Sequence, residues 1–336
     1  MYLIKRSQIF VFLSLLLAFS CQKKSCEMDP RIAAINLNLP IQRLEKDLYA
    51  SKSKEDVQRF LQTNPVFDRK YLQVDPNRLD DNFINSLYGL VTNPQLNKFV
   101  TETEQTFGNL ETQQRDLVTA FKHIKYYYPK TNLPRVQTFI SGLLGPDLVV
   151  SDSLIVLGLD YFVGDKGSYR PKQPQYILYR YKPQNLIPAV MLQQSAKFNS
   201  TDLEDKRMMA QMIYYGKSYY FTQQVLPCTP DSTLIGFSDQ QIADIRYNEG
   251  KIWAHLVEKN LLFETNHFKT GKYLEERPTV PEIDAKCPGR IGRWVGWQIV
   301  RKYMEENPTV TLPQLMAEKD AQKIFNNSHY KPKRRS

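Results

Sequence analysis

The sequence lacks the residue patterns by which many enzymes are recognised. It has only 4 histidines among 336 residues, and no two of them stand four residues apart, the spacing that puts two zinc-binding imidazoles on one helix face. It also has no G-x-S-x-G motif, P-loop or dinucleotide-binding motif. The sequence therefore gives no support for a histidine-based zinc site, a nucleophile elbow or a nucleotide-binding loop.

Cysteine is also scarce. The chain has 4 cysteines, and Cys26, Cys228 and Cys287 follow the first of them, Cys21. Three cysteines do not make a disulfide framework. Cys228 and Cys287 both lie in proline-containing segments, so two alternatives stay open: a bridge between them, or unpaired thiols.

The apolar run near the N-terminus is too short to cross a membrane. It covers the 11 residues Ile9–Phe19, whereas a transmembrane helix needs roughly 20. Two basic residues precede it and Cys21 follows it, which is typical of a bacterial lipoprotein signal peptide. We predict cleavage after residue 20, with diacylglycerol and an N-acyl chain such as palmitate on Cys21 as the membrane anchor. An ordinary signal peptide and an uncleaved anchor are the alternatives.

Positive charge is spread along the chain, which has a formal net charge of +10. This pattern indicates a solvated basic surface, and export from the cytoplasm argues against a nucleic-acid partner. We divide the chain into a signal peptide (1–20), a lipidated tether (21–29), a single domain (30–330) and a basic tail (331–336). No internal repeat is visible.

The periodicity of apolar residues predicts an α+β fold, dominated by helices, with one small central sheet. Val136–Ile140 and Leu154–Leu159 are predicted strands. Ser53 and Asp56 form a predicted capping box at the start of a series of short helices over residues 53–128. Further helices are predicted over residues 186–198, 201–224, 238–260 and 288–304.

Three segments of this domain resemble the gliding-motility lipoprotein family GldB of the Bacteroidota. They are Met212–Phe221, Tyr247–Glu249 with the nearby Trp253, and Pro288–Val300. The resemblance implies a lipoprotein that is needed for gliding and associated with the type IX secretion machinery. It implies envelope proteins of that machinery as partners, and it supplies no molecular activity.

A more distant likeness is to zincin-like peptidases that have lost the H-E-x-x-H site. In these peptidases two histidines hold zinc and the glutamate activates water. Here Gln193 and Gln194 stand in place of the first histidine and the glutamate, and Lys197 stands in place of the second histidine. An amide does not replace imidazole and lysine repels a cation, so this likeness implies no metal ligands and no catalytic residues.

The same likeness implies a cleft beside the following helix. Gly216 and Lys217 stand where the second zincin motif would be, and Tyr215, Tyr219 and Trp294 are candidates for lining the cleft. The alternatives are that Gln193, Gln194 and Lys197 form a solvated helix face, and that Trp294 belongs to the hydrophobic core.

We therefore expect a lipid-anchored, non-catalytic component of the gliding and type IX secretion machinery. It would act as a structural or protein-binding subunit at the outer membrane, facing the periplasm, with no cofactor except its covalent lipid. One alternative is an envelope hydrolase of zincin ancestry that has re-formed a site from Asp160, Glu249 and His255. Another is a surface lipoprotein that binds polysaccharide.

Overall fold

The computed structural model describes residues 27–75 and 80–332. The signal peptide, Cys21 and Cys26 lie outside the described residues. The described residues from Ile35 onward form one compact unit, and those before it belong to a second. The described part of the second unit contains the short helix α2 (Pro30–Ala33), which Asp29 caps by accepting a hydrogen bond from the Arg31 N–H.

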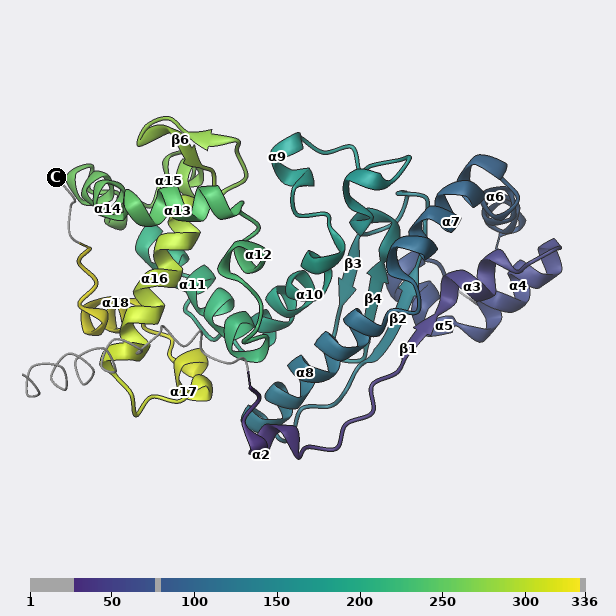
Figure 1. The fold of residues 1–336 in the computed structure, drawn as a ribbon, viewed down its shortest axis with the longest axis horizontal. Helices are drawn as coiled ribbons and strands as arrows, with labels where there is room; N and C mark the ends of the chain where they lie inside the picture. The colour runs from purple at the N-terminus through teal and green to yellow at the C-terminus, as the bar shows by residue number, and fades with distance from the viewer. Residues whose placement is uncertain (1–26, 76–79, 333–336) are drawn as a thin grey trace, which may run out of the picture. The chain divides into compact units, whose positions relative to one another are not determined.

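The sheet of the larger unit has four strands in the order β1-β2-β4-β3. The strands are β1 (Ile41–Arg43), β2 (Arg135–Phe139), β3 (Leu148–Val150) and β4 (Leu154–Gly158). β1, β2 and β4 are parallel, whereas β3 runs antiparallel to β4 at the edge. The two predicted strands are confirmed as β2 and β4, and the fold is α+β and helix-dominated, as expected (Figure 1).

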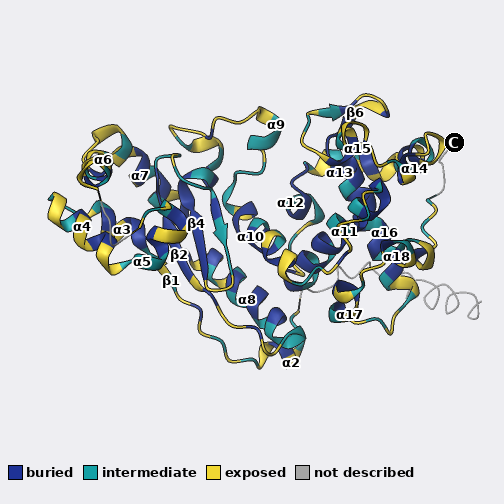
Figure 2. Cartoon of the chain, turned by 180° about the vertical axis from the view of Figure 1, so that it is seen from behind, coloured by how far each residue is buried: buried dark blue, intermediate teal, exposed yellow. Residues whose placement is uncertain are grey.

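Both faces of this sheet are covered. Successive side chains of a strand point to opposite faces. In β4, Leu154 and Val156 join one hydrophobic cluster, and Ile155 and Leu157 join the other. All five residues of β4 are therefore buried, as Figure 2 shows by its dark blue ribbon.

The smaller cluster packs the sheet against helices from the N-terminal part of the larger unit. The capping box at the start of the second of these helices is confirmed, because the Ser53 hydroxyl accepts from the Asp56 N–H and the Asp56 carboxylate accepts from the Ser53 N–H. The helices are α3 (Leu44–Tyr49), α4 (Lys54–Thr63), α5 (Pro65–Phe67), the π-helical turn η2 (Asp68–Leu72) and α6 (Asp81–Val91).

The larger cluster joins the other sheet face to most of the remaining helices. The longer ones are α7 (Pro94–Phe107), α8 (Glu111–Tyr127), α10 (Leu186–Gln194), α11 (Met208–Val225), α13 (Asp239–Tyr247), α14 (Glu249–Glu258) and α16 (Ile291–Glu306). Shorter helices are η3 (Leu159–Phe162), η4 (Gly164–Lys166), α9 (Gln175–Leu178), η5 (Pro183–Asn185), η6 (Ser195–Lys197), α12 (Asp231–Ile235), η7 (Leu261–Phe263), α15 (His267–Leu274), α17 (Leu312–Ala317) and α18 (Ala321–Ser328). A second sheet pairs β5 (Thr279–Val280) with β6 (Asp284–Pro288).

Two predicted helix starts are wrong. The helix expected from Thr201 begins only at Met208, because the Thr201 hydroxyl donates to the Asn199 side chain and does not cap a helix. The helix expected from Pro288 begins at Ile291, because Pro288 belongs to β6.

One predicted helix is divided in two. The helix predicted over 238–260 begins with a capping box of Ser238 and Gln241, but it breaks at Asn248, whose side-chain amide donates to the Asp244 carbonyl and ends α13. The predicted end of the helix over 288–304 is confirmed to within two residues, because α16 ends at Glu306.

The glycines of α11 and α16 explain how closely these two helices cross. A Cβ atom at Gly296 would lie 1.8 Å from the Met212 carbonyl oxygen, and one at Gly216 would lie 2.3 Å from the Gly296 carbonyl oxygen. Real side-chain carbons do not approach a backbone atom this closely. Glycine at both positions is therefore needed for the backbone contact, which offsets its cost of about 1 kcal/mol in a helix interior.

Candidate functional site

One cleft in the larger unit brings three arginines together, and we call it the arginine cleft. It has a volume of about 170 Å³, and Arg180, Arg290 and Arg293 are among its lining residues. Segments far apart in the sequence form it: the start of β3, the turn before η5, one face of α10, the end of α12 and the start of α16. Its position at the meeting of several elements is typical of a ligand site.

Arg290 is the most deeply buried of these arginines, at 4% exposure. Its Nη1 atom donates to the Ile235 carbonyl at 3.0 Å and to the Tyr219 hydroxyl at 3.4 Å, and its Nε atom lies 3.2 Å from Glu276 Oε1. Burial lowers the pKa of Arg290, but an arginine pKa starts so high that the group stays charged at neutral pH.

The backbone of Arg290 is in the left-handed region, with φ +59°, directly before α16. Glycine is the usual residue in such a conformation, and other residues lose roughly 1–2 kcal/mol there. The fold therefore holds an arginine where the backbone alone would favour glycine.

Arg180 shares the single carboxylate of Glu276 with Arg290. Its Nη1 atom lies 2.9 Å from the same Oε1 atom that pairs with Arg290. Its Nε atom is buried and has no hydrogen-bond partner within the described part of the chain. The Arg180 stem lies on Gly236, where a Cβ atom would be 2.3 Å from the arginine Cδ.

Arg293 lies one turn into α16. Its Nε atom donates to the Leu274 carbonyl, and its guanidinium lies 4.1 Å from the centre of the Tyr215 ring. Stacking on an aromatic ring holds a guanidinium without neutralising its charge. Arg293 thus adds positive charge to the cleft.

The other lining residues of the cleft include polar and apolar side chains. Tyr181 donates to Asp147 Oδ2 at 2.9 Å, and burial, with the nearby Asp147, raises the pKa of Tyr181, so the phenol stays protonated. Asn185, Ala189 and Gln193 are four residues apart and present one face of the η5–α10 segment to the cleft. The apolar lining residues include Leu148, Phe162, Leu192 and Leu234.

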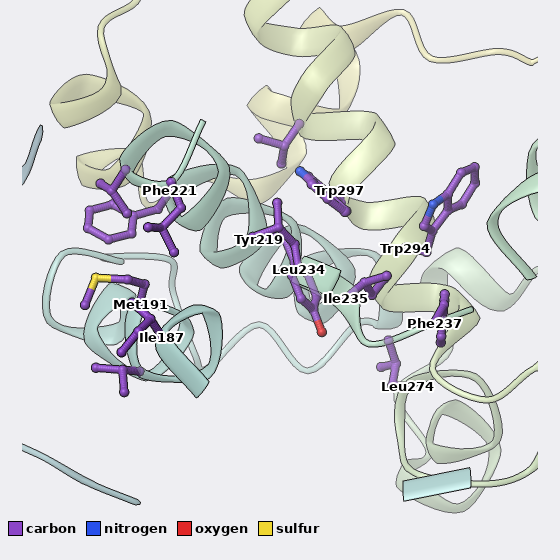
Figure 3. Close-up of a cluster of buried hydrophobic side chains, with 14 of the residues drawn as sticks. Ile187, Met191, Tyr219, Phe221, Leu234, Ile235, Phe237, Leu274, Trp294 and Trp297 are labelled. Atoms are coloured by element: carbon purple, nitrogen blue, oxygen red, sulfur yellow. The ribbon is translucent and has the colours of Figure 1, made fainter. Parts of the chain in front are cut away.

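The structure distributes the predicted site residues over different places. Gln193 and Tyr219 line the cleft. Tyr215 touches it only through the stacked Arg293, and Trp294 is 1% exposed in the core and is not a lining residue. Figure 3 shows Trp294 and Tyr219 among buried side chains. The ring centre of Tyr219 lies 5.4 Å from that of Trp297.

The remaining predicted positions lie away from the cleft lining. Gln194 is buried, and the α-helix ends there and continues as the 3₁₀ turn η6. Lys197 is exposed and pairs with Asp152 at 2.7 Å, at the turn between β3 and β4. Gly216 packs on α16.

Lys217 is fully buried and held by protein oxygen atoms. Its Nζ atom donates to the Thr201 hydroxyl at 3.0 Å and to the Glu318 carbonyl at 2.7 Å. Burial lowers the pKa of Lys217 to about 7. Lys217 thus joins the loop before α11 to the segment after α17.

The three residues of the alternative hydrolase site are engaged with separate partners. Asp160 accepts from the N–H groups of the 141–143 loop, and its burial raises its pKa to about 6. Glu249 accepts from the Tyr330 hydroxyl at 2.6 Å, and His255 Nε2 lies 2.9 Å from the Tyr273 hydroxyl. Within residues 27–75 and 80–332, no three His, Cys, Asp or Glu side chains are grouped as metal ligands.

The structure agrees with neither of the two cysteine alternatives for both residues. Cys287 is unpaired and buried, and burial raises its pKa to about 12. Cys228 is exposed and disulfide-bonded, so its bond is not to Cys287. The bridge between Cys228 and Cys287 is therefore excluded.

Comparison with known protein families decides the relationship. The family model described as gliding motility protein GldB matches residues 25–332. The chain belongs to the GldB family. No curated protein and no solved structure matches it. The GldB match includes every segment that forms the arginine cleft, so the cleft is part of the GldB domain.

GldB is a gliding-motility lipoprotein family, which agrees with the resemblance noted in the sequence. Within the described ranges, no helix is both long and apolar enough to span a bilayer. Membership of this lipoprotein family indicates a lipid-anchored envelope protein.

Sequence reasoning missed the arginines of the cleft. Arg290 and Arg293 stand in a segment that carries the GldB resemblance, but Arg180 and Glu276 come from two other segments. Their approach depends on tertiary structure. The one local signal was an arginine between two glycines, Gly289 and Gly292, at the start of a helix.

Proposed function

We propose that this GldB protein is a lipid-anchored, non-catalytic component of the gliding machinery. It would be tethered through Cys21 to the outer membrane, face the periplasm, and associate with the type IX secretion apparatus as a structural or protein-binding subunit. The observation that carries the proposal is the family match over residues 25–332, which includes nearly the whole mature chain.

The chemistry of the cleft supports the non-catalytic part of this proposal. Arg180 and Arg290 pair with Glu276. Asp147 accepts from the Tyr181 hydroxyl, and Arg293 donates to a backbone carbonyl. The cleft also carries the amides of Asn185 and Gln193. Charged groups paired in this way can bind and orient a partner. A carboxylate can act as a general base, but Asp147 and Glu276 already accept from Tyr181 and from two arginines.

We also propose a zincin ancestry in which the metal site has been lost. This rests on Gln193, which lies on the cleft-facing side of α10 where the zincin likeness places a histidine. Metal analysis of the purified protein tests the point. Stoichiometric zinc, together with a hydrolytic activity that a chelator removes, would instead favour the envelope hydrolase.

The anchoring proposal is tested by the substitution Cys21→Ala. We expect the variant to be lost from the membrane fraction and the cells to stop spreading on a surface, because a lipid-modified thiol is the proposed attachment. Membrane fractionation, immunoblotting and a spreading assay measure this, with Cys287→Ala as the control for loss of a thiol. Normal gliding by cells with only unanchored protein would contradict the proposal.

The proposed orientation is tested by protease accessibility in intact cells. A domain facing the periplasm is protected until the outer membrane is opened. Digestion of the domain in intact cells would contradict this orientation and favour the alternative, a surface lipoprotein that binds polysaccharide.

A further inference from the structure

The arginine cleft has more positive charge than the protein itself neutralises. Arg180, Arg290 and Arg293 line it, and the carboxylates in contact with its lining groups are Glu276 and Asp147. Asp147 accepts a hydrogen bond from Tyr181 and forms no ion pair with the three arginines. One oxygen of Glu276 forms ion pairs with both Arg180 and Arg290. One positive charge is left in excess at the cleft.

Several donor atoms of these arginines have no hydrogen-bond partner among residues 27–75 and 80–332. The buried Nε of Arg180 makes no hydrogen bond to the described residues. The Nε atom of Arg293 donates to the Leu274 carbonyl, and its guanidinium stacks on the Tyr215 ring. These contacts do not involve hydrogen bonds from its two terminal nitrogens, which can therefore donate to a ligand. Arginine has five N–H donors, and those buried without an acceptor cost free energy.

The position of Arg290 adds an independent observation. It is 4% exposed, it has a left-handed backbone, and its side chain is fixed by the Ile235 carbonyl, the Tyr219 hydroxyl and Glu276. A charge held rigidly in a cleft binds an anion with little loss of side-chain entropy. The start of α16 adds the positive end of a helix dipole on the same side.

We propose that this cleft binds a carboxylate group of an acidic protein segment. The planar guanidinium fork fits a carboxylate in two parallel hydrogen bonds. A carboxylate carries one negative charge, which matches the single charge in excess. A doubly charged phosphate would exceed it and would face Glu276 and Asp147.

The walls of the cleft favour a peptide as the source of the carboxylate. Leu148, Phe162 and Leu192 offer apolar surface beside the arginines, and Gln193 offers an amide that can pair with a peptide backbone. Apolar walls with a few fixed polar groups are typical of sites that bind a side chain and orient its backbone. The inference deepens the protein-binding part of the proposed function, but it is tested by binding in solution and not by motility.

The direct test is fluorescence anisotropy with the purified protein. The probe is a labelled pentapeptide with one glutamate between leucines and an amidated C-terminus. The matched probes are the same peptide with glutamine for glutamate, and the glutamine peptide with a free C-terminus. We expect saturable binding of the glutamate peptide and none of the neutral peptide. Binding of the free-terminus peptide alone would overturn an acidic side chain as the source of the carboxylate. Equal binding of the neutral peptide would overturn the proposal.

The matched protein variants separate the cleft from general surface charge. Arg180→Gln with Arg293→Gln removes two charges from the cleft, and Arg59→Gln with Arg115→Gln removes two from side chains that are 70% and 69% exposed elsewhere. Arg290 is left intact because its burial makes it a risk to folding. We expect about a hundredfold weaker binding in the cleft variant, about tenfold for each charged hydrogen bond lost, and no more than about twofold in the control.

Competition experiments identify the ligand chemistry. We expect acetate to displace the glutamate peptide better than inorganic phosphate does at equal ionic strength. Stronger displacement by phosphate would overturn the carboxylate assignment. Tighter binding of polygalacturonate than of the peptide would overturn the protein segment as the source. Unchanged affinity in a folded Arg180→Gln, Arg293→Gln variant would place the binding outside the cleft.

Discussion

Two buried cations contact α11, and they differ in what surrounds them. Lys217, on α11 itself, donates to the Thr201 hydroxyl and the Glu318 carbonyl and is not a lining residue of the cleft. Arg290 directly precedes α16 and donates to the hydroxyl of Tyr219 on α11, but it also lines the cleft. A buried charge therefore does not by itself indicate a functional site, and the presence of an open cleft beside it distinguishes the two.

The chemistry of the two side chains sharpens this difference. A lysine can lose its proton when burial is costly, and burial lowers the pKa of Lys217 to about 7. An arginine keeps its charge, so Arg290 needs Glu276 and an additional anion or water. We call Lys217 with its two acceptors the sealed lysine and compare it with the arginine cleft.

We expect the largest effect on stability at the crossing of α11 and α16. Lys217 lies on α11 and Arg290 directly precedes α16, so this crossing positions both regions. The substitution Gly296→Ala puts a Cβ atom 1.8 Å from the Met212 carbonyl oxygen, so the helices must separate. We expect a loss of about 3 kcal/mol or more in the free energy of unfolding. Urea unfolding measures it.

The matched control for this substitution is Gly89→Ala. Gly89 lies inside α6, and a Cβ atom there has no neighbour within 4 Å. Alanine should stabilise that helix by about 0.5–1 kcal/mol, because it has the higher helix propensity. Equal loss of stability at both glycines would contradict a special role for the helix crossing.

The sealed lysine should make stability depend on pH. Its pKa is about 7 in the folded chain and 10.5 when unperturbed, so between these values the unfolded chain binds more protons and stability rises with pH. We expect a rise of about 2–3 kcal/mol from pH 7 to pH 10 that is missing in Lys217→Met. Urea unfolding of both proteins across this range measures the difference. If the free energy of unfolding changed with pH equally in the wild type and in Lys217→Met, Lys217 would not be the cause of the pH dependence.

A buried carboxylate in the N-terminal part of the larger unit should give the opposite slope. Both side-chain oxygens of Asp68 are buried without a hydrogen-bond partner in the described structure, and burial raises its pKa from 3.8 to about 7. Between these values the folded chain binds more protons, so stability falls as pH rises from 4 to 7. We expect Asp68→Asn to remove about 1–2 kcal/mol of that fall.

Urea unfolding of wild type and Asp68→Asn at pH 5 and pH 8 checks this smallest effect. The substitution should be close to neutral at pH 5 and stabilising at pH 8. Asp165→Asn is the control, because Asp165 is paired with Arg170 at 3.5 Å and its side chain is 65% exposed. The same gain in the control would show that it comes from net charge and not from burial of Asp68.

The parts of the fold that follow from local chemistry were predictable from the sequence. The runs of β2 and β4 are rich in β-branched and large apolar residues, and Ser53 with Asp56 has the capping-box spacing. β1 and β3 have 3 residues each, too few to show a period, and their pairing depends on the strands beside them. The start of α11 was missed because Thr201 bonds to Asn199 and Lys217, a contact that no local pattern reveals.

The candidate site was predictable only in part, for the same reason. Gln193 and Tyr219 were named from the zincin likeness and do line the cleft, whereas Lys217, named with them, lies in the sealed contact. Lys217 and Tyr219 are two positions apart on α11, so they lie on different faces of the helix, and only the tertiary structure shows which face meets the cleft. Arg180, Glu276 and Arg290 are brought together from separate segments by the fold.

The most direct test of the difference between the two regions is peptide binding measured side by side on two variants. Arg180→Gln with Arg293→Gln changes the arginine cleft, and Lys217→Met changes the sealed lysine, with circular dichroism showing that both are folded. We predict that the cleft variant loses the glutamate peptide and that Lys217→Met binds it with wild-type affinity. Wild-type affinity in the cleft variant, or loss of binding in folded Lys217→Met, would contradict the account.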